Sequence, residues 1–176
     1  RRQRQMCIRD RSQGAGPLPN QYLKFENGAS KVDHFIGLVP SNHGTTAYGL
    51  NLFLNSTTSK LGARFDDSMT LLNGMSAPQQ LQGSDFNKAL YDTPVTQPGV
   101  KYTIITSTHD HVVVPYTNAY LHEPGVKNVL LQNICPTDKT GHGNITYDPN
   151  VIQMVDNELD SAHAHAVQCT PMKFIG

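Results

Sequence analysis

The chain has 176 residues, of which 38% are hydrophobic and 16% are charged, and its formal net charge is zero. This length suits one domain with a sizeable core, and the lack of any run of about 20 apolar residues excludes a membrane-spanning helix. The neutral charge argues against a nucleic-acid-binding domain, which would normally be basic.

The arginines are concentrated at the start of the chain. Five of the six lie in residues 1–11 beside one acid, Asp10, and the rest of the chain carries a net charge of −4. A solvated basic tail and a polyanion-binding arm are two interpretations. We favour a third, because residues 6–11 look like the translation of a transposase-end adapter used in sequencing libraries. We therefore treat residues 1–11 as an artefact, and we expect native sequence to begin at Ser12 without its original N-terminus or signal peptide.

The first half of the remaining sequence predicts one helix, one strand and an insertion. Residues 17–27 indicate a helix that ends at Gly28, and the apolar run 32–39 indicates a buried strand. Residues 41–99 are rich in small and polar residues. They predict weak helices near residues 49–54, 66–72 and 84–91, and no strand.

The second half predicts two strands and a helix. Strands are expected at residues 100–106 and 126–132, and Asp148 and Pro149 are typical of an N-cap and a first helical residue. The helix that they begin is expected to end near Asp160. Alternation of strands and helices predicts an α/β fold with parallel strands, so residues 12–176 are interpreted as one domain.

Three residue types that nucleophilic catalysis needs occur in the order serine, acid, histidine. Ser12 directly precedes a predicted helix, Asp110 follows the strand that ends at Thr106, and His142 follows the strand expected to end at Gln132. Each residue alone has an ordinary interpretation, as a helix cap, a turn residue or an exposed loop histidine. Their joint order favours a catalytic triad.

A resemblance to a known family runs from Ser12 to about Pro171. It is carried by Ser-Gln-Gly, by LKFENGASKVDHFIGLVPSNHGTT, by VKYTIITSTHDHVVVPY, by VKNVLLQNICPTDKTGHGNITYDP and by the closing Cys169. These motifs resemble the secreted class 2 lipases of the actinobacterial type. The resemblance implies the C-terminal portion of an α/β-hydrolase fold, secretion, and cofactor-free hydrolysis of carboxylic esters such as triacylglycerols.

By motif, the resemblance makes Ser12 the nucleophile, Asp110 the acid and His142 the base. The backbone N–H of Gln13 would supply one donor of the oxyanion hole. The chain departs from the pattern in residues 10–11, where glycine and commonly histidine are expected, and these two residues lie in the suspected adapter. The expected partner is a lipid or another carboxylic ester, met through transient contact with a lipid interface, and no nucleic acid.

The cysteines favour a disulfide. Without Cys7, the chain has Cys135 and Cys169, which are far apart in sequence. Two buried free thiols are the alternative, whereas a Cys135–Cys169 bond would stabilise the fold and imply an oxidising compartment. Two His-x-His pairs, at residues 109–111 and 163–165, lack the further ligands of a metal site, so we expect exposed histidines.

The role of residues 41–99 and the function of the chain each have a second interpretation. Residues 41–99 are expected to form a helical cap over the acyl pocket, or else to pack on the core. A non-catalytic relict used for binding, or a histidine-based metal-binding protein, is the competing function.

Because early strands of the fold are missing, with only a pseudo-strand at residues 5–9, we expect the strand at 32–39 to lose its inner neighbour. The isolated chain should then aggregate or show no ester hydrolysis.

Overall fold

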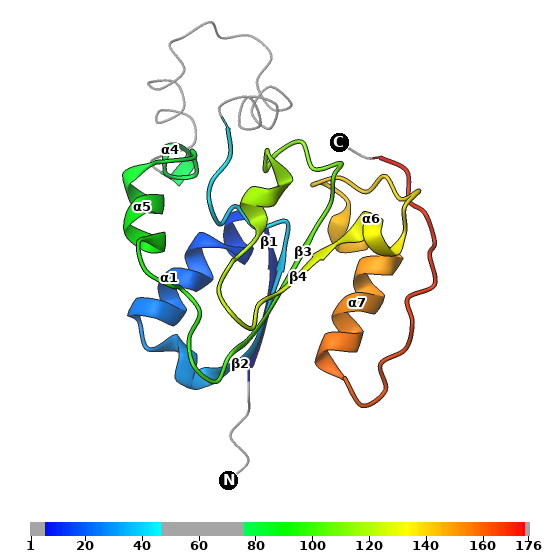
Figure 1. The fold of residues 1–176 in the computed structure, drawn as a ribbon, viewed down its shortest axis with the longest axis horizontal. Coiled ribbons are helices and arrows are strands. Elements are labelled where there is room, and N and C mark those ends of the chain that lie inside the picture. Colours follow the sequence, from blue (N-terminus) through cyan, green and yellow to red (C-terminus); the bar gives the residue numbers. More distant parts are fainter. Residues whose placement is uncertain (1–5, 47–75, 175–176) are drawn as a thin grey trace, which may run out of the picture.

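The structure is a computed structural model, and it describes residues 6–46 and 76–174. Two of the helical pieces expected in the insertion, near residues 49–54 and 66–72, lie outside the described residues. The described part forms a sheet with helices on both faces (Figure 1). None of its helices is long and apolar enough to cross a membrane.

The strands of the described residues all run in parallel, in the order β1-β2-β3-β4. They are β1 (Met6–Arg11), β2 (Val32–Leu38), β3 (Lys101–Thr106) and β4 (Lys127–Leu130). The α-helices are α1 (Pro17–Phe25), α4 (Ser76–Gln79), α5 (Asp85–Tyr91), α6 (Leu131–Ile134) and α7 (Pro149–Leu159). Short 3₁₀ turns are η1 (Ser12–Ala15), η2 (Gly28–Lys31), η3 (Tyr116–Ala119) and η4 (Ile145–Tyr147).

Helices cover the sheet from two sides, and each side has its own apolar core. Helices α1 and α5 lie on one face, and α7 lies on the other (Figure 1). On the first face, Leu23 of α1 and Leu90 of α5 are buried in one cluster with Phe35 of β2. On the second face, Val151 and Val155 of α7 belong to a separate buried cluster. Parallel strands need crossovers of this kind, and two covered faces explain why most residues of β2 and β3 are buried.

The sheet corrects the expectation about the first strand. Met6–Arg11 forms a six-residue strand, longer than the pseudo-strand expected at residues 5–9, and it pairs with β2 along its length. The strand at residues 32–39 therefore keeps an inner neighbour, and β1 and β4 are the two edge strands of the described sheet. The expectation failed because the composition of residues 6–11 is that of a basic segment, whereas their backbone finds a partner in β2. The origin of these residues stays a prediction.

Two element ends also differ from expectation. Strand β4 ends at Leu130, and Gln132 lies in the short helix α6. The physical reason is a turn that buries Leu131 completely while the Gln132 side chain contacts the neighbouring loops. Helix α1 ends at Phe25, before the stop expected at Gly28, and Asn27 takes the left-handed conformation, with φ of 56°.

Other local predictions are confirmed. Asp148 caps α7, because its side chain accepts hydrogen bonds from the backbone N–H groups of Asn150 and Val151. Cys135 and Cys169 form a disulfide, with their Cα atoms 4.9 Å apart. This bond ties the segment after α6 to the C-terminal segment.

Candidate active site

Ser12 lies at the sharp turn between β1 and η1. Its φ is +59°, a left-handed conformation that is uncommon for a non-glycine residue and tends to occur at functional sites. A serine held in this way between a strand and a helix is typical of the nucleophile turn of α/β-hydrolases, because the turn lifts the hydroxyl above the sheet edge. The turn also packs closely on itself, since a Cβ on Gly14 would lie 2.6 Å from a carboxylate oxygen of Asp10.

Asp110 and His142 form a buried pair. Their side chains are joined by a 2.9 Å contact between His142 Nδ1 and Asp110 Oδ2. The other carboxylate oxygen of Asp110 accepts hydrogen bonds from the backbone N–H groups of Val112 and Val113, at 2.7 and 2.9 Å. Asp110 is 4% exposed and His142 is 5% exposed. The acid is therefore fixed by the turn that follows it, and it is aimed at the imidazole.

The second ring nitrogen of His142 is the unusual feature of this pair. His142 Nε2 is buried and has no hydrogen-bond partner among the described residues. A buried nitrogen without a partner is costly in a folded protein, so its presence calls for an explanation. Within the described part of the chain no hydrogen bond joins Ser12 to this nitrogen. Catalytic hydrogen bonds are often formed only when substrate is bound.

The topology brings the three residues to one edge of the sheet. Ser12 follows β1 directly, Asp110 follows β3, and His142 follows β4, and the carboxyl ends of parallel strands share one edge. A direct contact links the first and last of these loops, because Arg11 Nη1 donates a 2.8 Å hydrogen bond to the backbone carbonyl of His142. Gln13 lies in η1 next to Ser12, where the N–H groups of the first turn have no partner within the turn itself.

Several polar residues on either side of His142 in the chain are buried, and sequence analysis singled out one of them, Asp148, only as a helix cap. Asp138, Thr140, Asp148 and Asn150 are all fully or almost fully buried. Burial raises the pKa of Asp148 above its usual value, and the negative charge of Asp138 adds to the increase. The available signal was the polar run between β4 and α7, which looked like a solvent-exposed loop.

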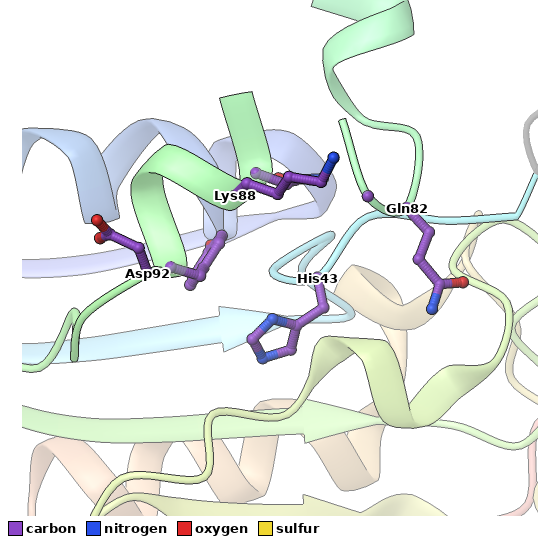
Figure 2. A pocket seen from close by; sticks show the side chains of 7 residues that line it. His43, Gln82, Lys88 and Asp92 are labelled. Atoms are coloured by element: carbon purple, nitrogen blue, oxygen red, sulfur yellow. The ribbon is translucent and has the colours of Figure 1, made fainter. Parts of the chain in front are cut away.

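A pocket of about 460 Å³ lies near the carboxyl end of β2 (Figure 2). Lys88 and Asp92 reach it from α5 and its end, Gln82 from the preceding turn, and His43 from the segment after β2. The His43 ring packs against Tyr91, with ring centroids 4.9 Å apart. Burial and repulsion from His122 lower the pKa of His43, so its imidazole is held in the neutral form.

The two His-x-His pairs lie in loops and face different surroundings. His111 packs against Phe174, with ring centroids 5.0 Å apart, and the exposed His163 lies 2.8 Å from Asp160. Within the described ranges, no group of three or more histidine, cysteine, aspartate or glutamate side chains is arranged to hold a metal ion.

The parallel sheet and its two helical layers constitute part of an α/β-hydrolase fold. The structure is similar to the crystal structure of Aspergillus fumigatus lipase B, with a TM-score of 0.65 and 23% sequence identity. The match covers 93% of this chain and 38% of the lipase chain, so the chain spans well under half of that protein. No protein-family model and no curated protein matches the chain. The similarity shows the fold, whereas the narrower resemblance to actinobacterial lipases stays a prediction.

Proposed function

We propose that the chain carries the catalytic residues of a serine carboxylic ester hydrolase of the lipase type. Ser12 is the nucleophile, His142 the general base and Asp110 the residue that orients the base. The observation that carries this proposal is the buried Asp110–His142 pair, whose Nε2 has no partner in the described structure. The left-handed turn at Ser12, on the same sheet edge, supports it.

In this mechanism the ester carbonyl is attacked by the Ser12 hydroxyl oxygen. His142 Nε2 takes the hydroxyl proton, and Asp110 stabilises the imidazolium through Nδ1. The negative oxygen of the tetrahedral intermediate is stabilised by the Gln13 N–H. The proton then passes from Nε2 to the departing alcohol, and an acyl-enzyme remains. Water, deprotonated by Nε2, releases the carboxylic acid and regenerates Ser12.

The substrate class and compartment are also proposals. The fungal protein of similar structure is a lipase, which supports a lipid ester substrate reached by transient contact with a lipid interface. The Cys135–Cys169 disulfide supports an extracellular location, since such bonds persist in oxidising compartments. We retain membership of the actinobacterial class 2 type as a hypothesis within this proposal.

Tests of catalysis need a protein that contains the rest of the proposed hydrolase fold. We propose that residues 12–176 belong to a longer hydrolase in which other residues precede Ser12. We refer to this longer, naturally encoded protein as the parent protein. The second donor of the oxyanion hole would come from its earlier strands, so the parent protein is the form we expect to turn over esters.

The test compares Ser12→Ala with Ser30→Ala in the parent protein. Ser30 is an exposed serine in η2, which precedes β2 and therefore lies away from the carboxyl edge of the sheet. With p-nitrophenyl esters, Ser12→Ala should lose roughly a thousandfold or more in kcat, as removal of a triad nucleophile does. Ser30→Ala should match the unmodified protein. A p-nitrophenyl phosphonate should label the Ser12 peptide, detected by mass spectrometry. Unchanged ester turnover in Ser12→Ala would remove Ser12 from the mechanism.

A further inference from the structure

The loop that carries the acid and the loop that carries the base are joined by a buried hydroxyl. Ser107 follows β3 directly and is fully buried, three residues before Asp110. Its Oγ donates a 2.6 Å hydrogen bond to the backbone carbonyl of Thr140, two residues before His142. The bond therefore joins the two loops at points three residues before Asp110 and two residues before His142.

The Ser107 hydroxyl has no capacity left for other partners. Besides donating to Thr140, its oxygen accepts hydrogen bonds from the His109 N–H at 3.1 Å and from Gln132 Nε2 at 3.0 Å. A hydroxyl has one donor and two acceptor sites, so all three are used. The two acceptor contacts fix the direction of the O–H bond. They also make the hydroxyl a rigid spacer between the loops.

Thr140 is held from its other sides by buried carboxylates. Its backbone N–H donates a 2.7 Å hydrogen bond to Asp138 Oδ1, and its hydroxyl donates to Asp148. The second oxygen of Asp138 accepts from Asn150 Nδ2 and from the Met172 N–H, at 2.8 and 3.1 Å. Thr140 is therefore fixed through its N–H, its hydroxyl and its carbonyl. The backbone that leads to His142 is therefore held in place at Thr140, two residues earlier in the chain.

We infer that Ser107 is a positioning residue for the proposed reaction: through Thr140 it sets the separation of Asp110 and His142. The inference rests on the proposed function of that pair. Ser107 touches neither substrate nor the reacting atoms, so its effect passes through the orientation of the imidazole. Misplacement of a catalytic group by about 1 Å can cost roughly a hundredfold in rate.

The test in the parent protein is Ser107→Ala, which removes only the hydroxyl. The control is Thr103→Val on β3, the strand that precedes Ser107, because it removes a buried hydroxyl that bonds to Glu158 at 3.0 Å and reaches neither catalytic loop. We expect kcat to fall about ten- to a hundredfold in Ser107→Ala with KM unchanged. Thr103→Val should lower only the melting temperature. Ser107→Thr, which keeps a hydroxyl, should recover most of the kcat.

A second readout does not depend on turnover. The His142 Nδ1 proton, hydrogen-bonded to Asp110, should give a downfield resonance in proton NMR. The resonance should be lost or broadened in Ser107→Ala and kept in Thr103→Val and in Ser12→Ala. This separates the two ideas, because failure of the Ser12 assignment leaves the resonance test intact.

Two outcomes overturn the inference. One is an unchanged kcat and an unchanged resonance in a folded Ser107→Ala protein. If that variant does not fold, Gln132→Leu gives the deciding measurement, since the half-buried Gln132 donates both to Ser107 Oγ and to the Asp138 carbonyl at 3.1 Å. We expect a smaller fall in kcat at constant KM there. If Gln132→Leu has the same kcat as the unmodified protein, this second result overturns the inference.

Discussion

The Cys135–Cys169 disulfide should make a large contribution to stability, because it closes a long loop that contains His142, the proposed base. The bond joins residues separated by 34 positions, and the enclosed segment includes His142 and the whole of α7. For a loop of this length, the chain-entropy model gives about 4 kcal/mol of stabilisation at 25 °C. In a domain of this size, that corresponds to a change in melting temperature of roughly 8–16 °C.

The assay is urea unfolding of the parent protein and of the double variant Cys135→Ala/Cys169→Ala, followed by far-ultraviolet circular dichroism. The variant removes both thiols, so no disulfide exchange can occur. We expect the free energy of unfolding to fall by about 4 kcal/mol and the m-value to rise, because the unfolded chain exposes more surface without the cross-link. Ser30→Ala is the control, because Ser30 is exposed and lies outside the loop that the disulfide closes, and it should leave the free energy of unfolding almost unchanged. A loss of less than about 1 kcal/mol in the double variant would refute the loop-closure argument.

Three further predictions concern pH and packing. Because the pKa of His43 is lowered below 6.5, the stability due to its neutral form is present above pH 6.5 and lost as the pH falls through the lowered pKa. His43→Gln should flatten this fall in the free energy of unfolding, and the exposed His163→Gln should not. Because the pKa of Asp148 is raised above 3.8, its contribution is present below pH 3.8 and lost as the pH rises through the raised pKa. Asp148→Asn keeps a good N-cap and should remove this loss above pH 3.8, whereas an unaltered pH profile would contradict the assignment. Gly37→Ala should cost about 1–3 kcal/mol in urea unfolding, since the new Cβ would lie 2.9 Å from the backbone carbonyl of Ala15, and a neutral effect would show that the Ser12 turn can move away from β2.

The sequence by itself determined the elements whose signals are local. The mostly apolar run at residues 32–39 and the run at residues 100–106, rich in residues that favour strands, became β2 and β3, and glycine or proline beside each run marked its end. Asp148 was recognisable as a cap because its bonding partners are two and three residues away. The order of Ser12, Asp110 and His142 was likewise visible, since parallel strands bring the residues that follow them to one edge.

Only the tertiary structure decided the features that depend on distant partners. Strand β1 exists because it pairs with β2, whereas its own composition indicates a basic segment outside the fold. The burial of Asp138 depends on Asn150 and on Met172, which is 34 residues further along the chain. Ser107 looks like an ordinary loop serine until the fold brings Thr140 against its hydroxyl. Hydrophobic periodicity shows which face of an element is buried, whereas the partners of a buried polar group come from whichever distant segment the fold places against it.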